Sequence, residues 1–164
     1  MSIDHLETIK KNALPGKVFV GGDCVPNLWS DAKYLYDLWN KKKAKNKAPQ
    51  RKDFTPQEMK QCLALIALHD ISYDPLRSKV RLIGTGVVEA TGMEATGWYV
   101  DEVQGTEFLL QRAKWIVENC CPMLCVDLPL IWSHLDYKHY DVLALPLIDE
   151  ADRVAMIMYL AKYY

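Results

Sequence analysis

The chain has 164 residues, half of them hydrophobic and a quarter charged, with a formal net charge of −1. This length suits one domain around one hydrophobic core, and this composition excludes a disordered chain. The sequence has no apolar run near the roughly 20 residues that span a bilayer and no apolar leader, so we expect a cytoplasmic protein without membrane contact.

The cysteines and a lysine-rich segment are the features of the composition that bear on metal, redox or nucleic-acid chemistry. The five cysteines show no CxxC spacing, so neither a metal site nor disulfides are expected. Residues 41–52 form a lysine-rich segment with seven basic side chains. Such a block could contact phosphates, but cations are also favoured at the C-terminal end of a helix. We therefore expect no nucleic-acid binding.

Residues 1–54 are predicted to form an N-terminal arm, a helix and a basic linker. Glycine and proline interrupt residues 1–27, which we interpret as an arm packed or frayed at the surface. A helix is expected from Ser30, because apolar residues recur at helical spacing, namely at Leu28, Ala32, Leu35 and Trp39. This stripe either packs against the chain's own sheet or forms a homodimer, since its seven-residue spacing suits a helix pair.

Residues 55–164 are predicted to form the main domain. Thr55 and Glu58 form a capping box that favours a short helix. Alternating apolar residues then predict a hairpin of strands over 63–73 and 80–85. Short glycine-linked turns should occupy 87–99, a long helix 106–120, and three strands 126–132, 141–148 and 154–163. This order predicts an α+β fold: a five-stranded antiparallel sheet with its helices on one side and an N-terminal helical extension.

Several short segments resemble a bacterial PAS-like subgroup. Residues 80–89, VRLIGTGVVE, are similar to its "RyRLvGT" strand and turn, and residues 92–97, GMEATG, are similar to its "GrdlTG" segment. Residues 143–147, LALPL, resemble its closing "LPL" strand. The resemblance covers roughly residues 30–159. It implies a sensory or interaction domain without enzymatic activity.

The expected binding site faces from the sheet toward the helical middle, where PAS-like folds leave a pocket with few polar groups. An arginine on a strand could hold a carboxylate by a fork of hydrogen bonds, or it could be exposed or paired internally. The candidate ligand-binding residues are Arg81, Trp98, Trp132, His134 and Tyr140.

The sequence offers fewer signals for catalysis or a cofactor than for a ligand-binding site. The serines lie outside any glycine-flanked nucleophile turn, and the glycines form no phosphate-binding loop. The alternative function is a small redox or haem protein that uses Cys120, Cys121 and Cys125, or His69 or His134. A buried cysteine and a hydrogen-bonded core histidine are the more common interpretations. We therefore expect a stand-alone, non-enzymatic sensor that binds a small molecule, a protein signalling partner, or both.

Overall fold

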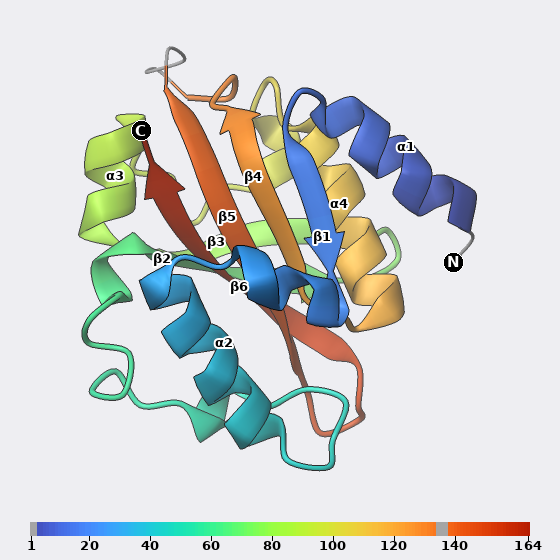
Figure 1. Ribbon diagram of the computed structural model, residues 1–164, viewed down its shortest axis with the longest axis vertical. Helices are drawn as coiled ribbons and strands as arrows, with labels where there is room; N and C mark the ends of the chain where they lie inside the picture. Colours follow the sequence, from blue (N-terminus) through green and yellow to red (C-terminus); the bar gives the residue numbers. More distant parts are fainter. Residues whose placement is uncertain (1–2, 134–137) are drawn as a thin grey trace.

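The computed structural model describes residues 3–133 and 138–164, and it contains one antiparallel sheet with helices on both faces (Figure 1). The strands are β1 (Lys17–Val20), β2 (Ile66–Ser72), β3 (Arg77–Ile83), β4 (Met123–Pro129), β5 (His139–Ile148) and β6 (Val154–Tyr163). Their order across the sheet is β1-β4-β5-β6-β2-β3. The two hairpins β2–β3 and β5–β6 therefore lie side by side, and the first strand after the hairpin β2–β3 crosses to the other half of the sheet.

The helices are α1 (Ile3–Ala13), α2 (Ser30–Lys43), α3 (Thr85–Thr91) and α4 (Glu107–Asn119), with short 3₁₀ turns η1 (Gly21–Asn27), η2 (Arg51–Asp53), η3 (Leu63–Leu65) and η4 (Val100–Glu102). α3, η4 and α4 form the helical middle between β3 and β4. None of the helices over the described residues is long and apolar enough to cross a bilayer.

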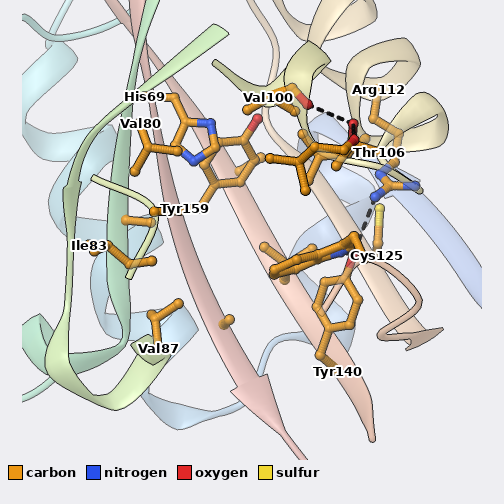
Figure 2. A pocket seen from close by; sticks show the side chains of 18 of the residues that line it. His69, Val80, Ile83, Val87, Val100, Thr106, Arg112, Cys125, Tyr140 and Tyr159 are labelled. Atoms are coloured by element: carbon orange, nitrogen blue, oxygen red, sulfur yellow. Dashed lines mark hydrogen bonds between the residues drawn. The ribbon is translucent and has the colours of Figure 1, made fainter. Parts of the chain in front are cut away.

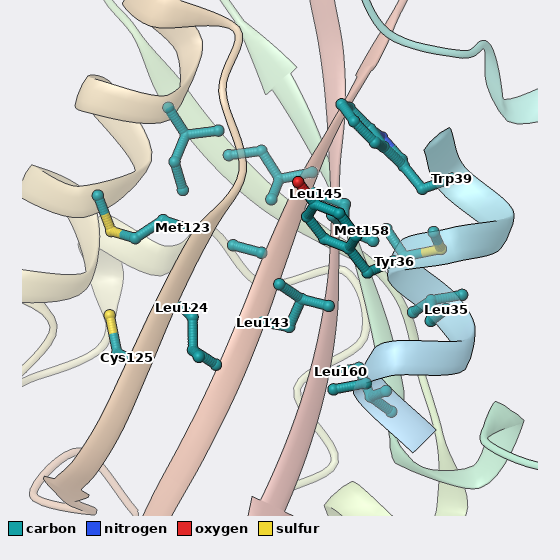
Figure 3. Close-up of a cluster of buried hydrophobic side chains, with 14 of the residues drawn as sticks. Leu35, Tyr36, Trp39, Met123, Leu124, Cys125, Leu143, Leu145, Met158 and Leu160 are labelled. Carbon is teal, nitrogen blue, oxygen red and sulfur yellow. The ribbon is translucent and has the colours of Figure 1, made fainter. Parts of the chain in front are cut away.

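The alternation of side chains along the strands gives the sheet two apolar faces. On β5, Val142 and Ala144 face the helical middle, whereas Leu143 and Leu145 face α2 and are fully buried. Figure 3 shows the α2 side of this core, where Leu143 and Leu160 lie between the strands and α2. Both faces are therefore covered within one chain.

α2 uses its apolar stripe against the chain's own sheet. Ala32 and Leu35 are fully buried, and Trp39 is 3% exposed. The indole Nε1 of Trp39 donates a buried hydrogen bond of 2.9 Å to the carbonyl oxygen of Pro146 on β5. Of the two alternatives for this stripe, the structure shows packing within the chain, so a homodimer through the same residues would require α2 to leave the sheet.

Two local expectations are wrong. The sheet has six strands instead of five, because residues 17–20 pair with β4 at its edge. Residues 56–62 form hydrogen-bonded turns instead of a helix, although the Thr55–Glu58 capping contacts are present. The helices of the main domain, α3 and α4, lie on one face of the sheet as predicted, and α2, the predicted N-terminal helical extension, covers the opposite face. The domain boundary after residue 54 stays a prediction.

Candidate ligand-binding cavity

A cavity of about 110 Å³ lies between the sheet and the helical middle (Figure 2). All strands except β1 contribute to its wall, and the helical middle closes it. Most of its lining is apolar, as at Val80, Val87, Val100, Leu109 and Ala144. Such a cavity, with a few polar groups among apolar ones, is typical of small-molecule sites.

Backbone contacts hold the helical middle against β3. The amide of Val80 donates to the carbonyl of Trp98 at 2.9 Å, and the amide of Gly97 donates to the carbonyl of Val80 at 2.7 Å. At the start of α3, a Cβ on Gly84 would lie 2.2 Å from the carbonyl oxygen of Ala64, so only glycine fits there. This close approach explains the glycine in the "RLIGT" segment and fixes where α3 leaves the sheet.

Further contacts secure the turn that roofs the cavity. Arg77 forms a two-pronged ion pair with Asp101, with N–O distances of 2.7 and 2.8 Å, and its guanidinium lies 3.6 Å from the ring centre of Tyr99. The Thr106 hydroxyl lies 2.7 Å from the carbonyl oxygens of both Val100 and Val103, and its one hydrogen is shared between them. These contacts place Val100 against the cavity.

His69 and Tyr159 form the polar part of the wall at β2 and β6. Nδ1 of His69 lies 3.0 Å from the hydroxyl of Ser78, and the His69 and Tyr159 rings are 4.7 Å apart. Burial lowers the pKa of His69 to about 4, so the imidazole is neutral at pH 7. Burial also raises the pKa of Tyr159, whose hydroxyl has no hydrogen-bond partner among the described residues.

Arg112, Tyr140 and Trp132 form a second polar group of the wall. The Arg112 guanidinium donates to the Tyr140 hydroxyl at 3.3 Å, and the indole Nε1 of Trp132 donates to the same oxygen at 3.4 Å. The Trp132 and Tyr140 rings meet edge to face, with centres 6.1 Å apart. Arg112 forms no ion pair with any described residue, which leaves most of its five donor hydrogens for other partners.

The cysteines do not favour the redox alternative. Burial raises the pKa of Cys120, Cys121 and Cys125, so each is a protonated thiol at neutral pH. A nucleophilic or redox-sensing cysteine instead needs a lowered pKa and access to solvent.

The structure brings together two of the five candidate residues, Trp132 and Tyr140. Arg81 and Trp98 do not line the cavity: the Arg81 side chain is 64% exposed and pairs with Asp70, and Trp98 is 47% exposed. The expectation that they point toward the helical middle is wrong. On β3 the neighbouring Val80 takes the inward position instead of Arg81, and Trp98 lies between α3 and η4 with its side chain exposed. His134 lies outside the described residues.

A haem does not fit the cavity as it stands. His69 does line the wall, but a dry cavity of about 150 Å³ in another protein holds only a benzene-sized ligand. A porphyrin is several times larger. The arrangement of His69 against Ser78 is that of a hydrogen-bonded core histidine, the alternative considered for it from the sequence.

Sequence reasoning missed Arg112 and Tyr159. Arg112 had a readable signal, because it follows Leu109 by three residues and precedes Ile116 by four, and thus lies on the apolar face of its helix. An arginine on such a face comes close to the apolar core when the helix packs against the sheet. Tyr159 had no comparable signal, since a tyrosine on an apolar strand is common.

Comparison with known proteins agrees with this geometry. A family model described as PAS domain matches residues 30–159. Curated proteins give no match to the chain. Among solved structures, the chain is similar to one described as "Structure of an RNA-binding Light-Oxygen-Voltage Receptor", with a TM-score of 0.46 and 12% identity. That match covers 65% of this chain and 32% of the receptor, so this chain spans about a third of the receptor's length.

Proposed function

Because the chain belongs to the PAS domain family, whose members are sensory and signalling domains, we propose that it binds a small molecule in the cavity and catalyses no reaction. The single observation that carries the proposal is the cavity itself, a mostly apolar space between the sheet and the helical middle. A packed core ordinarily leaves few voids larger than a water molecule. The atoms that line a void lack van der Waals contacts on one side, and a bound ligand would supply them.

The chemistry of the lining supports a binding role over a catalytic one. The imidazole of His69 is buried with its pKa lowered to about 4, which is too low for a general base at neutral pH. The Cys125 thiol is buried with a raised pKa, and no carboxylate of the described residues lines the cavity. The lining thus offers hydrogen bonds and one cation.

The signal would be a change in how the helical middle packs against the sheet. The segment between α3 and η4 is hydrogen-bonded to β3 at Val80, and Val100 of η4 packs against the same residue. Val87 of α3 and Val100 of η4 line the cavity and form the roof that a ligand would touch. A ligand that binds one packing of this roof better than another shifts the population toward it. We propose that a protein partner reads this shift at the surface of the cytoplasmic domain.

Native mass spectrometry of the freshly purified protein, compared with its denatured mass, tests the proposal. We expect a mass excess that disappears on denaturation. The variant Ala144→Leu fills part of the cavity and should lose the excess, whereas Ala151→Leu makes the same change in the exposed β5–β6 turn and should keep it. An excess retained equally by both variants would place the ligand elsewhere.

A further inference from the structure

We propose that the ligand is a small apolar monocarboxylate and that Arg112 binds its carboxylate. The inference rests on the proposed function, because it names the chemical class of molecule that the cavity takes. Two polar groups of the wall support this inference. Within the described part of the chain, the Arg112 guanidinium has no counter-ion and the Tyr159 hydroxyl has no hydrogen-bond partner.

The first group is the Arg112 guanidinium. It is half-buried between α4 and the sheet, it lines the cavity, and its one hydrogen bond in the described structure goes to the neutral Tyr140 hydroxyl. Partial burial of a charge without a counter-ion is costly, and a carboxylate matches the guanidinium fork with two parallel hydrogen bonds. The cavity therefore carries a charge that an anionic ligand would neutralise.

The second group is the Tyr159 hydroxyl on β6. Its oxygen is buried and, among the described residues, is the buried side-chain polar atom that has no hydrogen-bond partner. Buried hydroxyls in native proteins nearly always have a partner. Because Tyr159 lines the same cavity as Arg112, a ligand that fills the cavity would supply that partner.

The volume of the cavity and the route into it limit the size and polarity of the part of the ligand beyond its carboxylate. A volume of about 110 Å³ suits an apolar body of about the size of a benzene ring. A second hollow of about 70 Å³ shares Arg112, Trp132 and Tyr140 with the cavity, so the guanidinium stands between the two spaces. Its rim carries the exposed side chains of Phe108 and Ile131, which are 44% and 53% exposed. An apolar acid could enter there.

The charge of the lining selects a monocarboxylate over a phosphate. Arg112 is the one Lys or Arg side chain that lines the cavity in the described structure. A phosphate ester carries nearly two negative charges at pH 7, and one guanidinium would leave part of that charge unpaired in an apolar space. A single carboxylate is balanced by a single arginine.

Isothermal titration calorimetry of the full chain with benzoate and with benzyl alcohol tests the inference, since the two probes share a ring and differ in charge. We expect benzoate to bind at least about tenfold more tightly than benzyl alcohol. Arg112→Gln should weaken benzoate binding at least about tenfold and leave benzyl alcohol within about threefold. Arg81→Gln, which removes an arginine outside the cavity, should change neither.

Tyr159→Phe provides a second measurement if Arg112→Gln does not fold. It removes only the unpartnered hydroxyl, so the ligand-free fold should persist, and benzoate binding should weaken about two- to tenfold. Equal affinities of the wild type for the two probes, or an unchanged ratio in Arg112→Gln, would overturn the monocarboxylate while leaving a small-molecule site. Failure of both probes to bind, with no mass excess in the native spectrum, would overturn the proposed function as well.

Discussion

His69 shows how a single buried side chain couples this fold to pH. Its pKa in the folded chain is about 4, below the ordinary value of 6.5, because burial disfavours the imidazolium. Between these values the unfolded chain takes up a proton that the folded chain does not. The free energy of unfolding should therefore fall as the pH falls, by about 1 kcal/mol per pH unit from this residue.

Urea denaturation of the wild type and of His69→Gln between pH 5 and 7.5 measures this contribution. Glutamine can still contact Ser78 but takes up no proton, so the variant should lose stability less steeply below pH 6.5. Above pH 7 the two curves should run parallel. Equal slopes over the whole range would mean that the imidazole can be protonated in the folded state.

The cavity also shows, residue by residue, what the sequence could and could not reveal. Trp132 and Tyr140 were identified because they were expected to point from the sheet toward the helical middle, where PAS-like folds leave a pocket. Arg81 was misplaced because its orientation depends on the register of β3, and the β2–β3 ladder shifts its register between Leu68 and His69. A shift of one residue reverses the face of every following side chain, and a single strand does not record it.

α2 is the element that covers the face of the sheet opposite the helical middle. Leu35 is fully buried against the sheet, whereas Leu38 on the adjacent face is only half-buried. Leu35→Ala should lower the free energy of unfolding by about 2 to 5 kcal/mol, because it leaves a cavity. Leu38→Ala makes the same change and should cost clearly less.

Urea denaturation at two protein concentrations, tenfold apart, checks this prediction and the role of the stripe together. Packing within one chain makes the loss in Leu35→Ala independent of concentration. A midpoint that rises with concentration in the wild type, and not in Leu35→Ala, would assign the stripe to a homodimer instead.

The predicted elements differ in accuracy for a physical reason. The last strand, 154–163, was predicted with the bounds it has, and the long helix 106–120 matches α4 within a residue at each end. Both have long periodic patterns, which local sequence determines. β1 was missed because its four residues, KVFV, become a strand only by pairing with β4, far along the chain.

At the scale of the whole molecule, stability is unevenly divided. The main core joins both sheet faces to α1, α2 and α4, while Val80, Ala95 and Val100 form a separate, smaller cluster between β3 and the helical middle. A region with a small core of its own opens at a lower free energy than the main core. The roof of the cavity is therefore the part of the chain that a ligand can stabilise most.

Native-state hydrogen exchange of the full chain, with and without benzoate, measures this difference. Amides of α3 and η4 should exchange about tenfold or more faster than those of β5 and β6 in the free protein, since opening the roof spares the main core. Saturating benzoate should slow exchange in residues 85–105 far more than in β5. Uniform slowing across the sheet and the roof would mean that the ligand stabilises the fold globally, and that the helical middle does not move as a separate unit.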